Sequence, residues 1–343
     1  MAEGTERAEG ADLTILGGGS WGTALALHLA RSGRAVTLWI HDPSLAAAVA
    51  STRVNATYLP GHELPASVRV SGDLAASVKS ARDILLVVPS HHCRAVVTAA
   101  LPHLKAGATF CSASKGIESD TLLTVSGLLR ELLGAGAERR IAVISGPSFA
   151  AEVAAGHPTA LVVAAREAEL AQRLQQTLSA GALRAYTNAD VMGVELGGAL
   201  KNVVAIGAGV VEGLGYGSNT IAALITRGVA EVGRLALAMG GRRETLAGLA
   251  GLGDLVLTCT GRLSRNRALG AALAAGTTLE QHQAATPMVA EGVRTTLSAW
   301  RLARREGVEM PITAQVHALL YEGKTPVEAV HDLLARQLTR EEP

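Results

Sequence analysis

Lys201 combines a reactive side chain with an apolar setting, and it is the residue to which chemistry is most readily assigned. Only five of the 31 basic side chains are lysine, and this one lies in the apolar segment 191–211. A buried lysine can release a proton near neutral pH because desolvation and nearby cations lower its pKa, whereas arginine stays charged. A buried ion pair with Glu195 is the simpler alternative. We interpret Lys201 as a candidate general acid and base.

A glycine-rich segment near the N-terminus is typical of a phosphate-binding loop. Gly17, Gly19 and Gly22 fit the pattern G-x-G-x-x-G, after an apolar run at 13–16 and before a helical run at 23–30. The glycines would let the backbone approach a pyrophosphate, and the helix N-terminus would supply free N–H donors. A flexible turn is the alternative, but the strand before and the helix after favour dinucleotide binding.

The residues after the next predicted strand bear on which dinucleotide would bind. That strand, at 35–40, leads into His41 and Asp42. A carboxylate near this point usually binds the ribose diol of NAD. His41 cannot do so and would favour a 2′-phosphate, although an exposed loop histidine is an alternative. NADPH is therefore slightly favoured, and Asp42 leaves NADH open.

Ser264 and Arg265 indicate an anion site in the second half of the chain. Ser264 is a predicted helix N-cap, and Arg265 and Asn266 would lie in the first helical turn. A cation there opposes the helix dipole unless an anion binds, and a guanidinium can donate two hydrogen bonds to a phosphate. Solvated arginines at a helix start are the alternative.

The elements that must position these residues follow two patterns. Up to about residue 188 short apolar runs alternate with helical stretches, which predicts a parallel sheet with crossover helices. Beyond it only helical patterns continue. We therefore predict an α/β, Rossmann-like, doubly wound and mostly parallel sheet over 1–189, and an all-α domain over 190–343. Strands are expected at 13–16, 35–40, 84–88, 109–113, 141–144, 159–163 and 183–186. Turns at 89–90, 114–116 and 145–150 could line one crevice with the glycine loop, because ligands bind outside the carboxyl ends of such strands.

Composition excludes several classes of partner. The 343 residues carry 31 basic and 30 acidic side chains and 3% aromatics, which gives no basis for nucleic-acid binding. The cysteines, three in number and widely spaced, predict neither disulfides nor a metal site. The acidic N-terminus does not resemble a signal peptide, and Glu195, Lys201 and Asn202 interrupt the longest apolar run. A cytoplasmic protein without stable membrane insertion, and a homodimer, are expected.

Together the motifs resemble the bacterial NAD(P)-dependent glycerol-3-phosphate dehydrogenases over nearly the whole chain. The motifs that carry the resemblance, in the family's order, are 17–24 (GGGSWGTA), 88–90 (VPS), 114–116 (SKG), 145–150 (SGPSFA), 197–203 (GGALKNV), 251–255 (GLGDL), 264–266 (SRN), 289–292 (VAEG) and 310–312 (MPI). Gly18 replaces a usual alanine, and His41 stands where many members have arginine.

The resemblance implies a role for each site residue. Residues implied to contact NADPH or NADH are Gly17, Gly19, Ser20, Trp21, Gly22, His41, Lys115, Ala150, Arg265, Val289 and Glu291. Residues implied to hold the substrate are Lys115, Gly146, Ser148, Lys201, Asp254, Ser264, Arg265 and Asn266. The implied reaction is the reversible reduction of dihydroxyacetone phosphate to sn-glycerol 3-phosphate, a precursor for phospholipid synthesis, with Lys201 as the acid or base.

Two other functions stay open at this stage. A dehydrogenase for a carboxylate substrate would share the two-domain plan but would have less use for Arg265. A dinucleotide sensor without catalysis would bind the cofactor without needing Lys201.

Overall fold

The computed structural model describes residues 12–285, 290–338 and 340–341, which divide into two compact units. The first unit holds the chain up to Ser114 together with Val125–Val191. The second holds Lys115–Thr124 and the chain from Met192 onward. Lys115–Thr124 therefore belongs to the second unit by its contacts, although it lies within the first unit in sequence.

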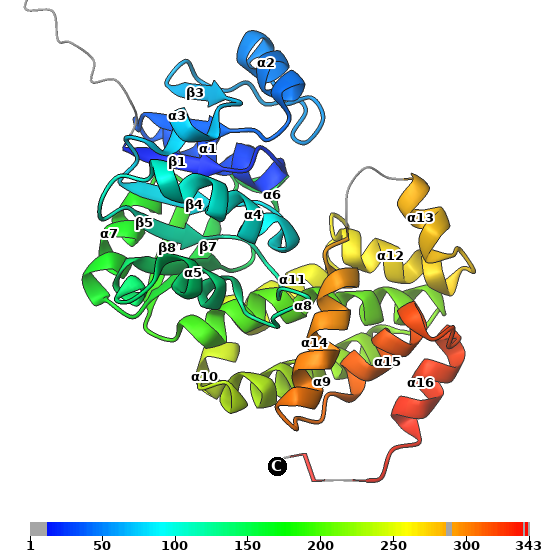
Figure 1. The fold of residues 1–343 in the computed structure, drawn as a ribbon. Helices are drawn as coiled ribbons and strands as arrows, with labels where there is room; N and C mark the ends of the chain where they lie inside the picture. The colour runs from blue at the N-terminus through cyan, green and yellow to red at the C-terminus, as the bar shows by residue number, and fades with distance from the viewer. Residues whose placement is uncertain (1–11, 286–289, 339, 342–343) are drawn as a thin grey trace, which may run out of the picture. The chain divides into compact units, whose positions relative to one another are not determined.

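A single sheet forms the centre of the first unit (Figure 1). Its strands are β1 (Leu13–Leu16), β2 (Val36–Trp39), β3 (Val68–Ser71), β4 (Asp83–Leu86), β5 (Thr109–Ser112), β6 (Ile141–Ser145), β7 (Thr159–Ala165) and β8 (Leu183–Asn188). Among the described residues the order is β3-β2-β1-β4-β5-β6-β7-β8, and neighbours are parallel except β6 and β7. The predicted mostly parallel sheet is confirmed. The edge strand β3 was not predicted, because Val68 alone of its four residues is buried and the apolar run is missing.

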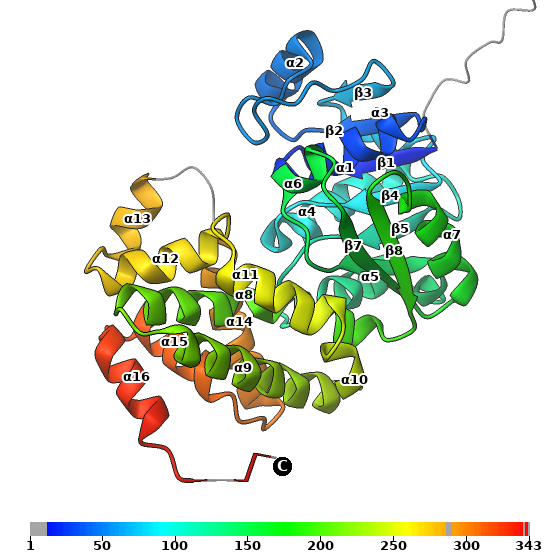
Figure 2. The same ribbon diagram turned by 180° about the vertical axis from the view of Figure 1, so that it is seen from behind.

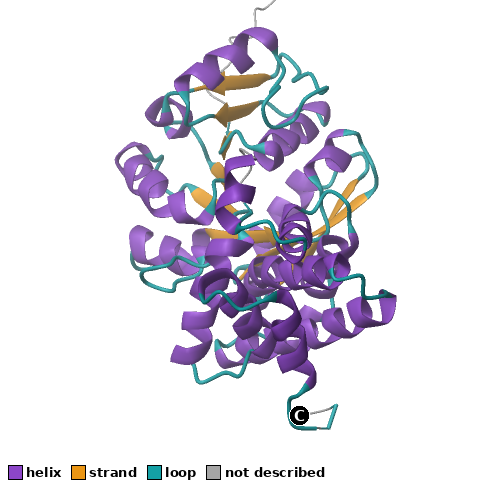
Figure 3. Ribbon diagram, turned by 90° about the vertical axis from the view of Figure 1, so that its right-hand side faces the viewer, coloured by secondary structure: helices purple, strands orange, loops and turns teal. Residues whose placement is uncertain are grey.

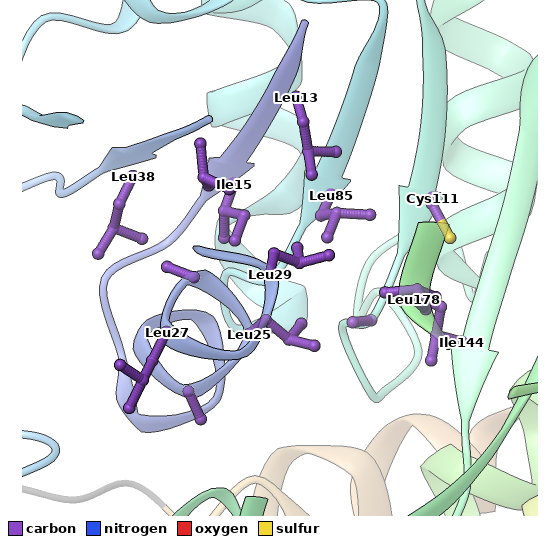
Figure 4. Packing of buried hydrophobic residues seen from close by; sticks show 14 of the residues in the cluster. Leu13, Ile15, Leu25, Leu27, Leu29, Leu38, Leu85, Cys111, Ile144 and Leu178 are labelled. Carbon is purple, nitrogen blue, oxygen red and sulfur yellow. The ribbon is translucent and has the colours of Figure 1, made fainter. Parts of the chain in front are cut away.

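Helices enclose this sheet (Figure 3). They are α1 (Ser20–Arg31), α2 (Pro43–Thr52), α3 (Leu74–Val78), α4 (Ser90–Ala100), η1 (Leu101–His103), α5 (Val125–Leu133), η2 (Ala137–Arg140), α6 (Ala150–Ala154) and α7 (Ala168–Leu178). Leu25 and Leu29 of α1 and Leu178 of α7 are buried in one core with Ile15 and Ile144 of the strands (Figure 4). This packing fixes α1 against β1, and so fixes the loop that joins them.

From Met192 onward the described part of the second unit is helical, and α8 runs through its core (Figures 1 and 2). Its helices are α8 (Val191–Gly213), α9 (Ser218–Ala238), α10 (Arg243–Leu246), the π-helical turn η3 (Leu249–Gly253), α11 (Asp254–Thr260), α12 (Arg265–Ala274), α13 (Leu279–Ala285), α14 (Gly292–Arg305), α15 (Pro311–Tyr321) and α16 (Pro326–Leu334). The predicted all-α second part of the chain is confirmed. Helix α8 is long and apolar enough to cross a membrane, but its most apolar stretch is entirely buried inside the protein. The predicted buried core helix is confirmed.

Helices α8 and α12 touch through their backbones. A Cβ on Gly209 would lie 1.9 Å from the Arg267 carbonyl oxygen, and one on Gly270 would lie 2.0 Å from the Ile206 carbonyl oxygen. At the end of α8, a Cβ on Gly213 would lie 2.6 Å from the Ala274 Cβ. Since no side chain can fit at Gly209, the first turn of α12 has a fixed place against α8, whereas Gly213 meets only the last turn of α12.

Candidate functional site

The glycine loop of the first unit has the shape that a pyrophosphate requires. Gly17 has φ +124°, and a Cβ there would lie 2.8 Å from the Val87 carbonyl oxygen. A Cβ on Gly22 would lie 1.9 Å from the Gly17 carbonyl oxygen, so this glycine lets α1 pack against the loop. A Cβ on Gly19 would meet nothing within 4 Å. Gly19 is therefore not required by packing, and it leaves open space beside the backbone.

The start of α1 leaves hydrogen-bond donors for an anion. Gly19 is the N-cap residue, no side chain caps the helix, and the first turn holds no acidic residue. The first N–H groups of a helix need acceptors and carry a partial positive charge. The Ser20 hydroxyl donates to the Tyr58 carbonyl oxygen at 2.6 Å, and Trp21 packs partly buried against the core. The loop thus fits the phosphates of a dinucleotide.

Asp42 is engaged in helix capping. Its Oδ1 accepts from the backbone N–H groups of Ser44 and Leu45 at 2.8 and 3.1 Å, which starts α2. The His41 ring lies edge-on to Trp39 with 5.7 Å between ring centroids. The Asp42 carboxylate, which could have bound the ribose diol of NADH, therefore already has backbone partners. His41 is exposed at the end of the same strand.

The turn after β6 holds the substrate residues predicted in the first unit. Gly146 has φ +139°, and the Ser148 hydroxyl donates to its carbonyl oxygen at 2.9 Å. Ala150 is the first residue of α6. Beside Gly146, the buried Ser145 Oγ has no hydrogen-bond partner in the described part of the chain. An unpartnered buried hydroxyl next to this turn is a polar group that a ligand could satisfy.

Three of the predicted substrate residues meet in the second unit. Lys115 Nζ donates to Asp254 Oδ2 at 2.8 Å, and Lys201 Nζ donates to Asp254 Oδ1. The Asp254 and Lys201 side chains are 1% and 9% exposed, so the contacts are largely shielded from water. The buried ion pair that was the simpler alternative for Lys201 is present, and the carboxylate that the structure shows in it is that of Asp254.

The charges of this cluster separate the two lysines chemically. Burial and the Lys115 charge lower the pKa of Lys201 to about 7, although Asp254 opposes the shift. Burial also disfavours the Lys115 charge, but Asp254 and Glu291 outweigh it and hold the pKa of Lys115 above its ordinary value. Burial would raise the pKa of Asp254, but the two lysines hold it below its ordinary value. Lys201 can therefore exchange a proton near neutral pH while Lys115 stays charged.

Local backbone geometry brings Asp254 to Lys201. Gly197 lies one helical turn before Lys201, and a Cβ on it would lie 2.6 Å from the Ala250 carbonyl oxygen in η3. The π-helical turn ends at Gly253, so Asp254 begins α11. The Thr258 hydroxyl donates to the Asp254 carbonyl oxygen at 2.6 Å. Close approach of α8 and η3 is thus what allows the ion pair.

The predicted N-cap of α12 is confirmed, and its two arginines differ in their contacts. Ser264 Oγ accepts from the Arg267 backbone N–H at 3.2 Å. The Arg267 guanidinium pairs with Glu212. Arg265 is exposed and forms no ion pair or hydrogen bond with any described residue, although its charge acts on Glu291. Arg265 is thus available for an anion.

Glu291 is the N-cap residue of α14, and Asn266 of α12 contacts the first residue of that helix. Burial raises the pKa of Glu291, and Arg265, Lys115 and Lys201 oppose the rise. Asn266 Oδ1 accepts from the Gly292 backbone N–H at 2.9 Å. Val289, a predicted cofactor contact, lies outside the described residues. Sequence reasoning missed the Asp254–Lys201 pair and the Asn266–Gly292 bond, since each joins segments far apart in the chain.

Comparisons with known proteins cover both parts of the chain. Residues 12–171 match the family model for the N-terminus of NAD-dependent glycerol-3-phosphate dehydrogenase, and residues 190–331 match the model for its C-terminus. Glycerol-3-phosphate dehydrogenase (NAD(P)+) of Koribacter versatilis is 49% identical over 331 residues, 96% of this chain and 98% of that protein. The protein of the same description from Geobacter metallireducens is 50% identical over 327 residues, 95% of this chain and 98% of that protein.

A solved structure is similar over the whole fold. The crystal structure of glycerol-3-phosphate dehydrogenase from Coxiella burnetii is 42% identical, with a TM-score of 0.91, and the match covers 95% of this chain and 99% of that one. The two chains therefore share much of their sequence as well as the α/β and all-α fold.

Proposed function

The chain belongs to the family of NAD(P)-dependent glycerol-3-phosphate dehydrogenases, and from that premise we propose that it interconverts dihydroxyacetone phosphate and sn-glycerol 3-phosphate, with Lys201 exchanging the proton. The reduced nicotinamide supplies a hydride to the ketone carbon when it is bound. The carbonyl oxygen must then gain a proton, and the observation that carries the proposal is the buried Lys115–Asp254–Lys201 cluster.

Lys201 is proposed as the general acid of reduction and the general base of oxidation. Its lowered pKa, about 7, suits a group that must both give and take a proton near neutrality. Asp254 accepts a hydrogen bond from the Lys201 ammonium and so holds the Lys201 side chain, which extends from α8, in position.

Lys115 is proposed to stabilise negative charge on the substrate oxygen. Its pKa lies above the ordinary value, so it stays protonated while Lys201 titrates. A fixed cation beside a developing alkoxide lowers the barrier, since the charge it stabilises is larger in the transition state than in the ketone.

The first turn of α12 is proposed to bind the substrate phosphate. Arg265 has no protein partner among the residues that the structure describes, and Ser264 and Asn266 flank it. A guanidinium at a helix N-terminus can donate two parallel hydrogen bonds to a phosphate. Binding the remote phosphate would orient the ketone. The resemblance also gives Gly146 and Ser148 substrate contacts, and these remain part of the proposal.

The first unit is proposed to bind the dinucleotide, with NADPH slightly favoured. Gly19 leaves open backbone for the pyrophosphate, and Ser20, Trp21 and Ala150 of the same unit are contacts that the family implies. The family also implies contacts to the dinucleotide from Lys115, Arg265, Val289 and Glu291. Asp42 caps α2, which leaves it less available to a ribose diol, and His41 can face a 2′-phosphate.

The wider setting of the enzyme completes the proposal. We place it in the cytoplasm as a homodimer that supplies the glycerol phosphate backbone of phospholipids. Residues 1–189 would form the dinucleotide-binding domain and 190–343 the substrate domain.

The direct test is loss of reduced-nicotinamide absorbance with dihydroxyacetone phosphate, run in parallel with NADPH and NADH. We expect turnover with the phosphorylated ketone and a lower KM for NADPH. Turnover of a carboxylated ketone instead would favour a carboxylate dehydrogenase. Tight NADPH binding with no turnover of either ketone would favour a dinucleotide sensor.

A further inference from the structure

The carboxamide of Asn266 is oriented by a backbone group of α14. Its Oδ1 accepts from the Gly292 N–H at 2.9 Å, and a backbone N–H can pair only with the oxygen of an amide side chain. The Nδ2 group is therefore turned away from Gly292. Asn266 is 8% exposed, and its Nδ2 donates to no atom of the described residues. Two N–H donors on Asn266, the residue that follows Arg265 in the first turn of α12, are thus left for an anion.

Gly292 can make this contact only because it lacks a side chain. A Cβ on Gly292 would lie 2.6 Å from Asn266 Oδ1, 2.8 Å from the Asn202 carbonyl oxygen and 2.9 Å from Ile206 Cδ1. The first two are closer than a carbon atom can approach an oxygen. Any side chain here must displace Asn266, and it must also separate the start of α14 from α8.

The first turn of α14 is held rigidly around Gly292. The Thr296 hydroxyl donates to the Gly292 carbonyl oxygen at 2.7 Å, and the Tyr321 hydroxyl donates to the Val293 carbonyl oxygen at 2.8 Å. Thr296 is fully buried, so its hydrogen bond is shielded from water. The N–H that orients Asn266 therefore comes from a backbone that cannot easily move away.

From these contacts we propose that Gly292 is a positioning residue for the substrate phosphate: its N–H fixes the Asn266 carboxamide so that Nδ2 donates to the phosphate. The inference rests on the proposed function, since it assigns an orienting group to the phosphate site of that reaction. Glu291, which the family implies as a cofactor contact, directly precedes Gly292. The same turn of α14 thus carries one residue for each ligand.

The test uses Gly292→Ala in the full-length enzyme, with Gly213→Ala as a matched control. In both variants the new Cβ meets its nearest atom at 2.6 Å, but Gly213 lies at the far end of α8, against Ala274. The readout is the preference for dihydroxyacetone phosphate over dihydroxyacetone, expressed as a ratio of kcat/KM values. This ratio is insensitive to disturbance of Lys201, which would slow both substrates equally.

We expect Gly292→Ala to reduce this preference by roughly tenfold or more, the scale of one hydrogen bond to a charged group. Gly213→Ala should lower the thermal midpoint and leave the preference within about twofold, because it touches packing and no phosphate donor. An unchanged preference in Gly292→Ala, or an equal loss in both variants, would overturn the proposal.

A double-mutant cycle with Asn266→Ala separates positioning from packing. If Gly292 acts through Asn266, adding Gly292→Ala to Asn266→Ala should cost little further preference, although stability should still fall because the clash with the Asn202 carbonyl remains. Additive losses of preference would mean that Gly292 acts by another route. A wild-type enzyme with no preference for the phosphorylated ketone would defeat the proposed function itself, whereas a normal wild type with additive variants would defeat only this inference.

Discussion

At the scale of single residues, the chemistry depends on one carboxylate shared by two ammonium groups. Asp254 contacts both Lys115 and Lys201, and the two lysines have pKa values displaced in opposite directions. Burial lowers the pKa of Lys201 most, and the charge of Lys115 lowers it further against the opposing effect of Asp254, so the cluster has to be considered as a unit.

The titration of Lys201 predicts opposite pH profiles for the two directions. Reduction needs the protonated amine, so its kcat should be full below about pH 7 and should fall as the pH rises through the lowered pKa. Oxidation needs the neutral amine, so its kcat should rise over the same range. Stopped-flow measurement of hydride transfer in both directions checks this.

Lys201→Met should lose roughly 10² to 10⁴-fold in rate, and near-normal turnover would exclude the role.

The neighbours of Lys201 should move this profile in opposite directions. Lys115→Gln removes the like charge that lowers the pKa of Lys201, so the midpoint should shift to higher pH. Asp254→Asn removes the carboxylate that raises the pKa of Lys201, so the midpoint should shift to lower pH. Shifts of the same sign in both variants would contradict the cluster as described.

Arg265 provides a residue-scale prediction for specificity. Arg265→Lys keeps the charge but loses the planar pair of donors, so it should remove most of the preference for dihydroxyacetone phosphate over dihydroxyacetone. Arg267→Lys is the matched control, because Arg267 in the same turn is already paired with Glu212. If Arg265→Lys lowered kcat/KM for both substrates by the same factor, Arg265 would be assigned to cofactor binding or to the stability of the fold.

At the scale of elements, the loop before α1 is predicted to bind the dinucleotide through its backbone. Gly19→Val should weaken NADPH binding, measured by fluorescence titration, because a side chain would fill the open space beside the loop. Gly217→Val is a close control. Both glycines are N-caps with extended backbone, φ −74° and −85°, and a Cβ on either meets nothing within 4 Å. If Gly19→Val and Gly217→Val bound NADPH with equal affinity, the loop would be a structural turn with no role in cofactor binding.

The element α2 provides a prediction for cofactor choice. Asp42 caps this helix, so Asp42→Ala should destabilise the protein by about 1 kcal/mol, measured by denaturant unfolding. It should leave the ratio of KM values for NADH and NADPH nearly unchanged, because the carboxylate serves the backbone. A selective rise in KM for NADH would show instead that Asp42 binds the ribose diol.

Elements with strong local signals were predictable from sequence. Apolar runs predicted every strand of the sheet that the structure describes except β3, and the Ser264 cap was read from its residue type. The π-helical turn η3 was not predicted; it lies against Gly197, which is about 50 residues earlier in the chain. The partner of Lys201 was missed for the same reason: Glu195 is near in sequence, whereas Asp254 is near in space.

At the scale of the whole molecule, the chain passes between its two units more often than a single boundary near residue 189 implies. Lys115–Thr124 joins the second unit and the chain then returns to the first at Val125. Nothing in the composition of this short segment marks the change. What holds it is tertiary: Ile117 is 3% exposed in the core of the second unit, and Ser298 Oγ donates to Ser119 Oγ at 3.3 Å.

This path predicts that a change in the first half of the sequence destabilises the second unit. Ile117→Ala should cost about 2 to 5 kcal/mol, because it opens a cavity in a core shared with α8 and α14. Amide hydrogen exchange should show the loss in α8 and α14 while β1 and β4 keep their protection. Lys115 is two residues away, so the midpoint of the pH profile should also move upward as its charge becomes less fixed beside Lys201. Loss of protection confined to the first unit would mean that Lys115–Thr124 contributes to the stability of the sheet instead.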